Sequence, residues 1–233
     1  MNTYSIQRYG RTFRLEANDK WLAEHYERGE LQEHHMLDWI VANIPDGGLW
    51  VDVGSCNAQH ALVFATKADF VLAIEPMPEN HACCLRNTDA NPSIGARIEV
   101  LSIGAGDRRG WATPKPGGSG QPSQWQLVPA SSDSSGEAIL VLPLDAILSS
   151  SDVRLIKIDV EGMESAVVSG AMSTIARCRP ELFIEVWEEA HMRGLEAKLA
   201  PLGYVLIERF NVVPTYHFSA SGRYPVTYTP PPK

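Results

Sequence analysis

The sequence predicts an α/β fold with a mainly parallel, doubly wound sheet, and three observations favour it. Short apolar runs of strand length alternate with stretches of helical periodicity, as in βαβ units. Three of these runs, LWVDVGS, VLAIEP and LIKIDVEG, end in acidic residues. Glu75 also follows Asp52 at nearly the spacing of a nucleotide-binding half-domain, in which an acidic residue about 20 positions past the first turn accepts ribose hydroxyls. Because ligands bind beyond the carboxyl ends of such strands, the acidic ends predict one shared site.

The composition is that of a globular protein with a sizeable core. The 233 residues are 44% hydrophobic and 21% charged, and the formal net charge is −8. Because proteins that bind nucleic acids usually carry a basic face, this balance argues against a nucleic-acid partner. The first residues, MNTYSIQRYG, contain no apolar segment of signal-peptide length, and the longest apolar stretch, AILVLPLDAIL, contains Pro143 and Asp145. We therefore expect neither a signal peptide nor a membrane span.

The four cysteines indicate a reducing compartment. They show neither CxxC spacing nor a dense framework, and Cys83 and Cys84 are adjacent in a stretch expected to be helical. Such thiols are normally reduced in the cytoplasm, so we expect a cytoplasmic protein without a zinc site.

Residues 1–45 are predicted to form an arm and helices that cover the acceptor or the cofactor. Apolar and polar residues alternate over 4–15, which predicts a hairpin or an extended arm. Helical periodicity follows over 19–43, and Gly29 is expected to divide it into two helices.

Residues 46–210 are predicted to form the core. The expected strands are 49–53, 70–74, 97–103, 139–142, 155–158, 182–187 and 204–210. The expected helices are 58–67, 79–89, 163–176 and 189–200, with a brief one starting at Asp145. Residues 113–136 are rich in Pro, Gly and Ser without periodicity, which predicts a long loop or lid. Residues 211–233 are expected to form a C-terminal strand and a loosely ordered tail.

Several motifs, in this order along the chain, resemble those of the FkbM-type methyltransferase family, which uses S-adenosylmethionine. They are VDVGS at 51–55, IEPMPEN at 74–80, GDRRG at 106–110, IKIDVEGMES at 156–165 and GAMSTIARCRPELFIEV at 170–186. The resemblance covers residues 30–187. It implies the seven-stranded sheet of class I (Rossmann-like) methyltransferases, with a last strand antiparallel to the others. It also implies O-methyl transfer to a hydroxyl of a small acceptor, a sugar, glycan or secondary metabolite.

The loop after the first core strand departs from the family pattern. The family reads DVGAN, one variable residue and then Gly, whereas this chain has Ser55, Cys56 and Ala58 at the corresponding positions. Because glycine is favoured where the backbone bends through positive φ, Ala58 is expected to narrow the approach to a cofactor. Two alternatives therefore stay open. One is a cofactor-binding or scaffold protein that has lost catalysis, and the other is an NAD-dependent oxidoreductase, disfavoured because GSCNAQ contains one glycine.

The spacing of the first two strand ends and the chemistry of the cofactor that the resemblance implies suggest roles for the residues there. Glu75, followed by Pro76, is expected to accept both ribose hydroxyls; the alternative is a solvated loop acid. Gly54 and Ser55 would lie against the methionine portion. Asp52 would orient this turn or contact the amino group, or only tie down backbone amides.

Two further residues are candidate cofactor ligands. Asp107, after the third strand, is placed to approach the adenine, although Asp is equally natural in a turn such as GDRRG. Glu33, with Glu30 beside it, matches an acidic spot in the family's N-terminal segment and is expected to close over the cofactor. The alternative for Glu33 is a solvated helix face.

The candidate catalytic residues follow the later strands. Asp159, in the IDVEG motif, is expected at the site or as a helix N-cap. Lys157 lies on the same strand face as Asp159, and Glu185 on the next strand is expected to pair with it, as a structural ion pair or as a catalytic one. His191 is a candidate general base.

The expected cofactor is S-adenosylmethionine, and no metal is assigned. A divalent cation held by Asp159, Glu185 and His191 is possible but not expected. The sequence identifies neither the acceptor nor the oligomeric state. Glu161 and Glu164 are expected to face the same site, or to be acids of a first helical turn stabilised by the helix dipole.

Overall fold

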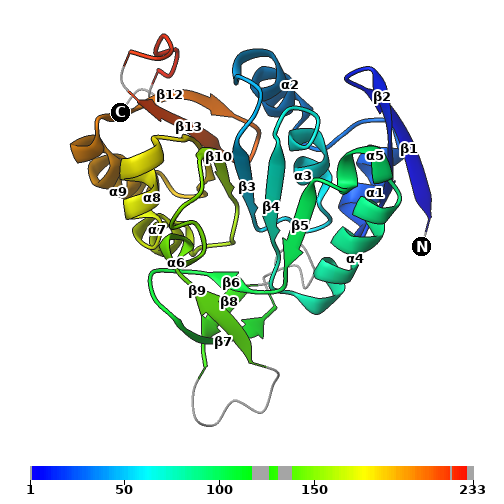
Figure 1. Ribbon diagram of the computed structural model, residues 1–233, viewed down its shortest axis with the longest axis horizontal. Coiled ribbons are helices and arrows are strands. Elements are labelled where there is room, and N and C mark those ends of the chain that lie inside the picture. Colours follow the sequence, from blue (N-terminus) through cyan, green and yellow to red (C-terminus); the bar gives the residue numbers. More distant parts are fainter. Residues whose placement is uncertain (1, 117–125, 131–137, 221, 230–233) are drawn as a thin grey trace.

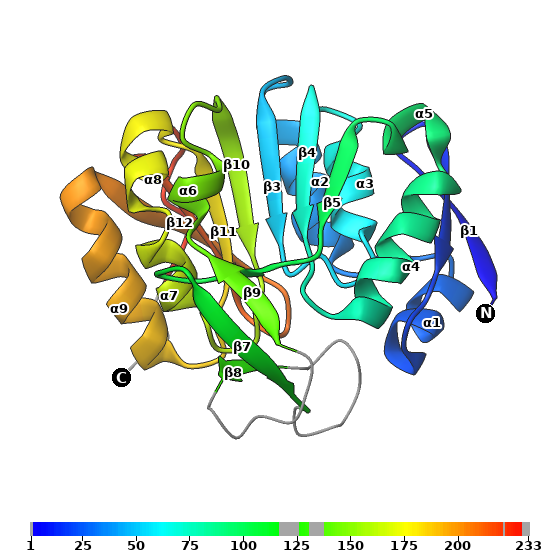
Figure 2. The same cartoon turned by 60° about the horizontal axis from the view of Figure 1, so that its bottom comes forward.

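The computed structural model describes residues 2–116, 126–130, 138–220 and 222–229. It is a three-layer α/β/α arrangement in which helices cover both faces of a seven-stranded sheet. A smaller sheet lies beside one end of the large one (Figures 1 and 2). The predicted fold class is therefore confirmed.

Six strands of the large sheet are parallel, and one runs the other way. In spatial order they are β12 (Tyr204–Phe210), β13 (Thr215–Ala220), β11 (Glu181–Glu185), β10 (Val153–Ile158), β3 (Leu49–Val53), β4 (Phe70–Ile74) and β5 (Ile98–Leu101). β13 is antiparallel to both of its neighbours. The antiparallel last strand that the family resemblance implies is thus present, although its residue pattern alone did not predict it.

The central strands are apolar along their length because both faces of the sheet are covered. β10 and β3 lie side by side in register, with Lys157 opposite Asp52 and Ile158 opposite Val53. Nearly every side chain of these two strands is buried. Two charged residues are therefore buried next to each other at the centre of the sheet.

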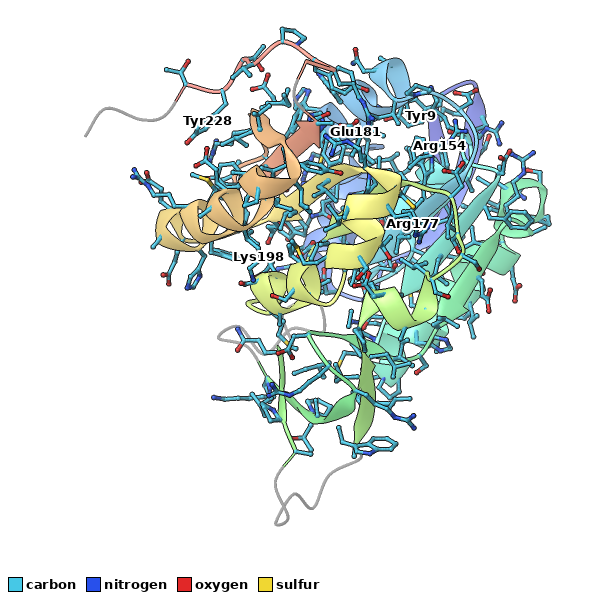
Figure 3. All side chains as sticks on the ribbon, turned by 60° about the vertical axis from the view of Figure 1, so that its left-hand side comes forward. Tyr9, Arg154, Arg177, Glu181, Lys198 and Tyr228 are labelled. Carbon is cyan, nitrogen blue, oxygen red and sulfur yellow. The ribbon has the colours of Figure 1, made fainter. Side chains whose placement is uncertain are left out.

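Two separate apolar cores form on the two faces of the sheet. One face is covered by α1 (Lys20–Glu27), α2 (His34–Asn43), α3 (Gln59–Phe64), α4 (Pro78–Asp89) and α5 (Pro92–Gly95). The other is covered by α6 (Leu144–Ile147), α7 (Glu164–Ser169), α8 (Met172–Cys178) and α9 (Glu189–Leu199). Lys198 of α9 donates hydrogen bonds to Ser165 and Ser169, which ties α9 to α7 (Figure 3).

The N-terminal arm is a hairpin of β1 (Thr3–Arg8) and β2 (Arg11–Glu16), as predicted. It packs through Ile6 and Phe13 onto the core of the α1–α5 face. The predicted break near Gly29 separates α1 from α2, and Asp19 caps α1 by accepting a hydrogen bond from Leu22 N at 2.8 Å. No helix among the described residues is long and apolar enough to cross a membrane.

Part of the predicted 113–136 loop is in fact a second sheet. Its strands, in spatial order, are β6 (Gly104–Ala105), β9 (Ile139–Leu142), β7 (Gly110–Lys115) and β8 (Gln126–Pro129). The prediction is wrong for the end of β7 and for β8 because strand pairing overrides a composition rich in turn-forming residues. Residues 117–125 and 131–137 of the predicted loop lie outside the described residues.

The helix predicted over 163–176 is divided into α7 and α8 at Gly170. A side chain at Gly170 would place its Cβ 1.9 Å from the carbonyl oxygen of Gly106, so the small sheet approaches the helix backbone directly there. The periodicity of the sequence does not reveal this contact, because the contact depends on Gly106, which lies far from Gly170 in the sequence.

We expect Gly54→Ala to destabilise the protein because Gly54 closes the end of β3 against the end of β10. Gly54 has φ +83°, and a Cβ there would lie 1.7 Å from the carbonyl oxygen of Asp159. The free energy of unfolding should fall by about 1–3 kcal/mol or more, measured by urea denaturation. The control is Gly194→Ala in α9, where an added Cβ would have no described residue within 4 Å. It should change stability little or raise it by about 0.5–1 kcal/mol. Equal stability of both variants would contradict this reading of Gly54.

Candidate active site

A cavity of about 700 Å³ lies at the carboxyl ends of β3, β4, β10 and β11. Gly54, Glu75, Asp159 and Glu185 contribute to its wall from those four strand ends. The volume is in the usual range for small-molecule sites. Two strand-end acids that the sequence singled out, Glu75 and Asp159, thus face a common cavity. The third, Asp52, does not line it.

Glu75 is buried at the end of β4 and held by backbone donors. It is 4% exposed and accepts hydrogen bonds from Cys56 N at 2.8 Å and Met77 N at 2.9 Å. Burial raises its pKa to about 7, against the lowering effect of these bonds. Asn80 Nδ2 also donates to Oε1, at a longer distance of 3.4 Å. Each carboxylate oxygen has two acceptor sites, so Oε2 can still accept from a ligand in the cavity. The alternative of a solvated loop acid is wrong.

The loop after β3 keeps a glycine-like backbone without the second glycine. Cys56 and Ala58 both have positive φ, 54° and 64°. Such conformations are uncommon for residues other than glycine and cost of the order of 1–2 kcal/mol each. The methyl group of Ala58 is fully buried in the α1–α5 core and does not line the cavity. The expected narrowing at Ala58 is therefore not observed.

Lys157 is buried among carboxylates on the β10 side of the cavity. It is 1% exposed, and its Nζ lies 3.0 Å from Asp159 Oδ2. Burial alone would lower the pKa of Lys157, but Asp159, Asp52 and Glu33 outweigh it and raise that pKa. Among the described residues Lys157 forms no ion pair with Glu185, so the expected Lys157–Glu185 pair is replaced by one with Asp159.

Asp159 does not cap α7, because that helix begins at Glu164, with Met163 as the N-cap and no side-chain cap. The capping alternative for Asp159 is therefore wrong. Glu161 is in a left-handed turn with φ 54° and lines the cavity, so it is not part of a first helical turn. Glu164 turns back and accepts from Gly162 N at 2.8 Å.

Glu33 is buried rather than solvated. Its side chain is 6% exposed and lies 3.2 Å from His60 Nε2, and Asn211 Nδ2 donates to it at 2.7 Å. Burial would raise the pKa of Glu33, but the contact with His60, the charge of Lys157 and the bond from Asn211 lower it. Glu33 therefore joins α2 to the turn before β13 across the cavity wall.

Asp52 and Ser55 lie behind the cavity wall. Asp52 is fully buried, and among the described residues neither of its carboxylate oxygens has a hydrogen-bond partner. Ser55 donates its hydroxyl to the carbonyl oxygen of Asp52 at 2.8 Å. Asp52 lies directly across from Lys157 in the sheet, and its charge helps to raise the pKa of that lysine. Asp52 thus acts on the site through Lys157.

Two of the predicted site residues lie away from the cavity. Asp107 is exposed, and its Oδ2 lies 3.3 Å from Nη1 of Arg108, its neighbour in the chain. His191 is exposed near the start of α9. Neither lines the cavity, whereas Pro76 does.

The cavity wall includes residues that sequence reasoning did not select. Trp187, two residues beyond Glu185, is 55% exposed and lines the cavity with Asn211 and Val212. A tryptophan two residues after the end of a predicted strand is a signal that could have revealed Trp187, because strand ends of this sheet face the ligand site. The turn of Asn211 could not be found this way, since nothing in the sequence places it opposite Glu33.

Strained backbone is concentrated around this cavity. Seven non-glycine residues among those described have positive φ, and four of them line it. These four are Glu33, Cys56, Glu161 and Asn211. Such conformations persist where surrounding contacts enforce them, and they are frequent at binding sites.

Comparison with known proteins identifies the family and the fold of the chain. The family model described as the methyltransferase FkbM domain matches residues 41–206. No curated protein matches the chain.

Solved structures share the fold. A methyltransferase FkbM from Methylobacillus flagellatus has 20% identity and a TM-score of 0.58, with 75% of this chain and 44% of that one covered. This chain therefore spans less than half of that relative. A precorrin 8W decarboxylase from Methanobacterium thermoautotrophicum has 13% identity and a TM-score of 0.52, with 82% and 90% covered. A ribosomal protein L11 methylase from Lactobacillus delbrueckii has 12% identity and a TM-score of 0.52, with 88% and 81% covered. With the motifs, the sheet order and the matched region all in agreement, the chain belongs to the FkbM methyltransferase family.

Proposed function

We propose that this protein is an S-adenosylmethionine-dependent O-methyltransferase acting on a hydroxyl of a small acceptor, such as a sugar, a glycan or a secondary metabolite. The observation that carries the proposal is Glu75, a buried carboxylate fixed by two backbone N–H groups and facing the cavity at the end of β4. This is the position at which a nucleoside ribose is held in related α/β sites.

The residues present fit the proposed cofactor. Glu75 would accept the ribose hydroxyls, with Pro76 beside it, and Gly54 would lie against the methionine portion. The adenine role expected of Asp107 has no support from its position. When bound, S-adenosylmethionine supplies an electrophilic methyl group on a positively charged sulfur. The acidic wall of Asp159, Glu161 and Glu185 suits that positive charge.

Asp159 and Glu185 are the proposed groups for the acceptor hydroxyl. Lys157 acts as a positioning residue, because its bond to Asp159 Oδ2 holds that carboxylate at the cavity wall. A nearby carboxylate can accept the proton that the hydroxyl loses as its oxygen attacks, and we assign this role to Asp159. Burial and the charges of Asp159 and Glu33 raise the pKa of Glu185 well above its usual range, so Glu185 would instead orient the hydroxyl. His191, exposed and outside the cavity, is not proposed as the base.

The mouth of the cavity favours an acceptor with a flat apolar face. Trp187 and Trp21 are 55% and 46% exposed there, and Val212 is 95% exposed. Indole rings pack well against such faces. The net charge of −8 supports an acceptor other than a nucleic acid, and four free cysteines support a cytoplasmic location.

Binding of S-adenosylhomocysteine, measured by calorimetry, tests the cofactor assignment. Glu75→Ala should weaken it by about 10- to 100-fold, since hydrogen bonds to a charged group contribute about 1.5–3 kcal/mol. The matched control is Glu79→Ala, an exposed acid on the first turn of α4, which should bind as the wild type does. No binding by the wild type at high micromolar ligand would contradict the proposed function, and equal affinity in Glu75→Ala would contradict the role of Glu75.

The affinity for S-adenosylhomocysteine should also depend on pH through Glu75. Because the pKa of Glu75 is raised to about 7, the carboxylate gains a proton as the pH falls through 7 and loses acceptor capacity. The dissociation constant should therefore rise by about 10-fold between pH 8 and pH 6. Glu75→Gln, which does not titrate, should show a flat profile over this range. A profile in Glu75→Gln as steep as in the wild type would assign the effect to another group.

A further inference from the structure

Three carboxylates at the cavity wall are close enough to share one cation. Asp159, Glu161 and Glu185 each offer an oxygen, and these oxygens all lie within 4.8 Å of one another. Asp159 and Glu161 come from the turn after β10, and Glu185 ends the neighbouring strand β11. The sheet register therefore brings the three together.

Glu185 provides a second observation that points to a ligand. It is 7% exposed, lines the cavity, and has no hydrogen-bond or ion-pair partner among the described residues. A carboxylate so deeply buried is normally paired, bound to a metal ion or protonated. The ammonium group of Lys157, which lies close by, is bound to Asp159 instead.

The charges around the cavity are also unbalanced. Lys157 is surrounded by Asp52, Asp159 and Glu33, which already exceed its single positive charge. Glu161 and Glu185 add two more carboxyl groups on the cavity side, and burial together with the charge of Asp159 raises the pKa of both above the usual range. Carboxylates held this close repel one another unless a cation or a proton lies between them.

We propose that Asp159, Glu161 and Glu185 bind one divalent cation of the Mg²⁺ type, and that the cation's open positions face the cavity. Carboxylate oxygens are the ligands that Mg²⁺, Mn²⁺ and Ca²⁺ prefer. Oxygens across an octahedral Mg²⁺ are separated by about 4.2 Å, twice the usual Mg–O distance of about 2.1 Å. The three oxygens lie within 4.8 Å of one another, so side-chain movements of some tenths of an ångström would bring them into such a shell, with water or ligand oxygens completing it.

This inference rests on the proposed function for its purpose. With the cation bound, Asp159 would act on the acceptor as a ligand of the cation, and the cation would hold the oxygen of the acceptor hydroxyl beside the bound cofactor. It would thereby restrict acceptors to those that present a hydroxyl to the acidic wall. The donor set differs from the sequence hypothesis, which used His191; Glu161 takes its place, because His191 lies away from the cavity.

Titration of the chelator-treated full chain with Mn²⁺, followed by electron paramagnetic resonance, tests the site. We expect one Mn²⁺ per chain, displaced by excess Mg²⁺. Glu185→Gln and Glu161→Gln should each weaken binding by at least about 10-fold, since each removes a charged ligand. Glu188→Gln is the matched control, three residues beyond Glu185 and exposed, and should bind Mn²⁺ as the wild type does. Thermal melting of each variant verifies that it is folded.

The outcomes separate this proposal from the proposed function. No Mn²⁺ binding by the wild type at millimolar concentration overturns the cation site, as does unchanged binding in both folded glutamine variants. Calorimetry with S-adenosylhomocysteine in EDTA is independent of the cation. If that ligand binds while Mn²⁺ does not, the cation site fails and the proposed function stands. If Mn²⁺ binds while S-adenosylhomocysteine does not, the cation site stands and the proposed function fails.

Discussion

The structure of the site depends on one buried ammonium group. Lys157 lies on a central strand, with Asp52 across from it, Asp159 bonded to it and Glu33 nearby. An uncompensated charge at such depth would cost several kcal/mol, so the lysine and the carboxylates require one another. Without Lys157, the ends of β3 and β10 would carry carboxylates with no positive charge between them. The ammonium group of Lys157 therefore stabilises the carboxylates that form the acidic wall of the cavity.

The backbone conformation around the cavity is set by the close approach of the same two strand ends. β3 and β10 approach so closely at their ends that Gly54 has no space for a side chain beside the carbonyl group of Asp159. The chain leaves both strands through left-handed turns, at Cys56 and at Glu161. These turns direct the N–H group of Cys56 toward Glu75 and place Glu161 at the cavity. Local strain is thus used to orient polar groups toward one space.

Much of the fold could be predicted from the sequence because it depends on local patterns. The apolar runs at 49–53 and 70–74 form buried parallel strands wherever helices cover both faces. Their order in the sheet required the family resemblance. The strands β7 and β8 could not be predicted, since their stability comes from pairing with each other and with β9.

The site was predictable where a residue's position in a strand determines its surroundings. Glu75 and Asp159 end strands and therefore face the cavity. The partner of Lys157 was not predictable, because the direction of a long side chain depends on which nearby carboxylate it reaches. The burial of Glu33 depends on His60 and Asn211, which lie far from it in sequence. Asp107 and His191 follow strands as well, but the chain turns away from the cavity before each of them.

The position of β13 has a consequence for how the protein acquires its shape. Among the described strands, β12 pairs with the large sheet through β13 alone, which is made later and is inserted between β12 and β11. The hairpin must therefore dock as a unit, and its turn carries Asn211, which bonds to Glu33 178 residues earlier in the chain. Contacts of such long sequence separation form late, because the loop between them must first be closed. During synthesis, then, the acidic wall would remain open to water until β13 emerges, and the cavity would be completed when this hairpin docks.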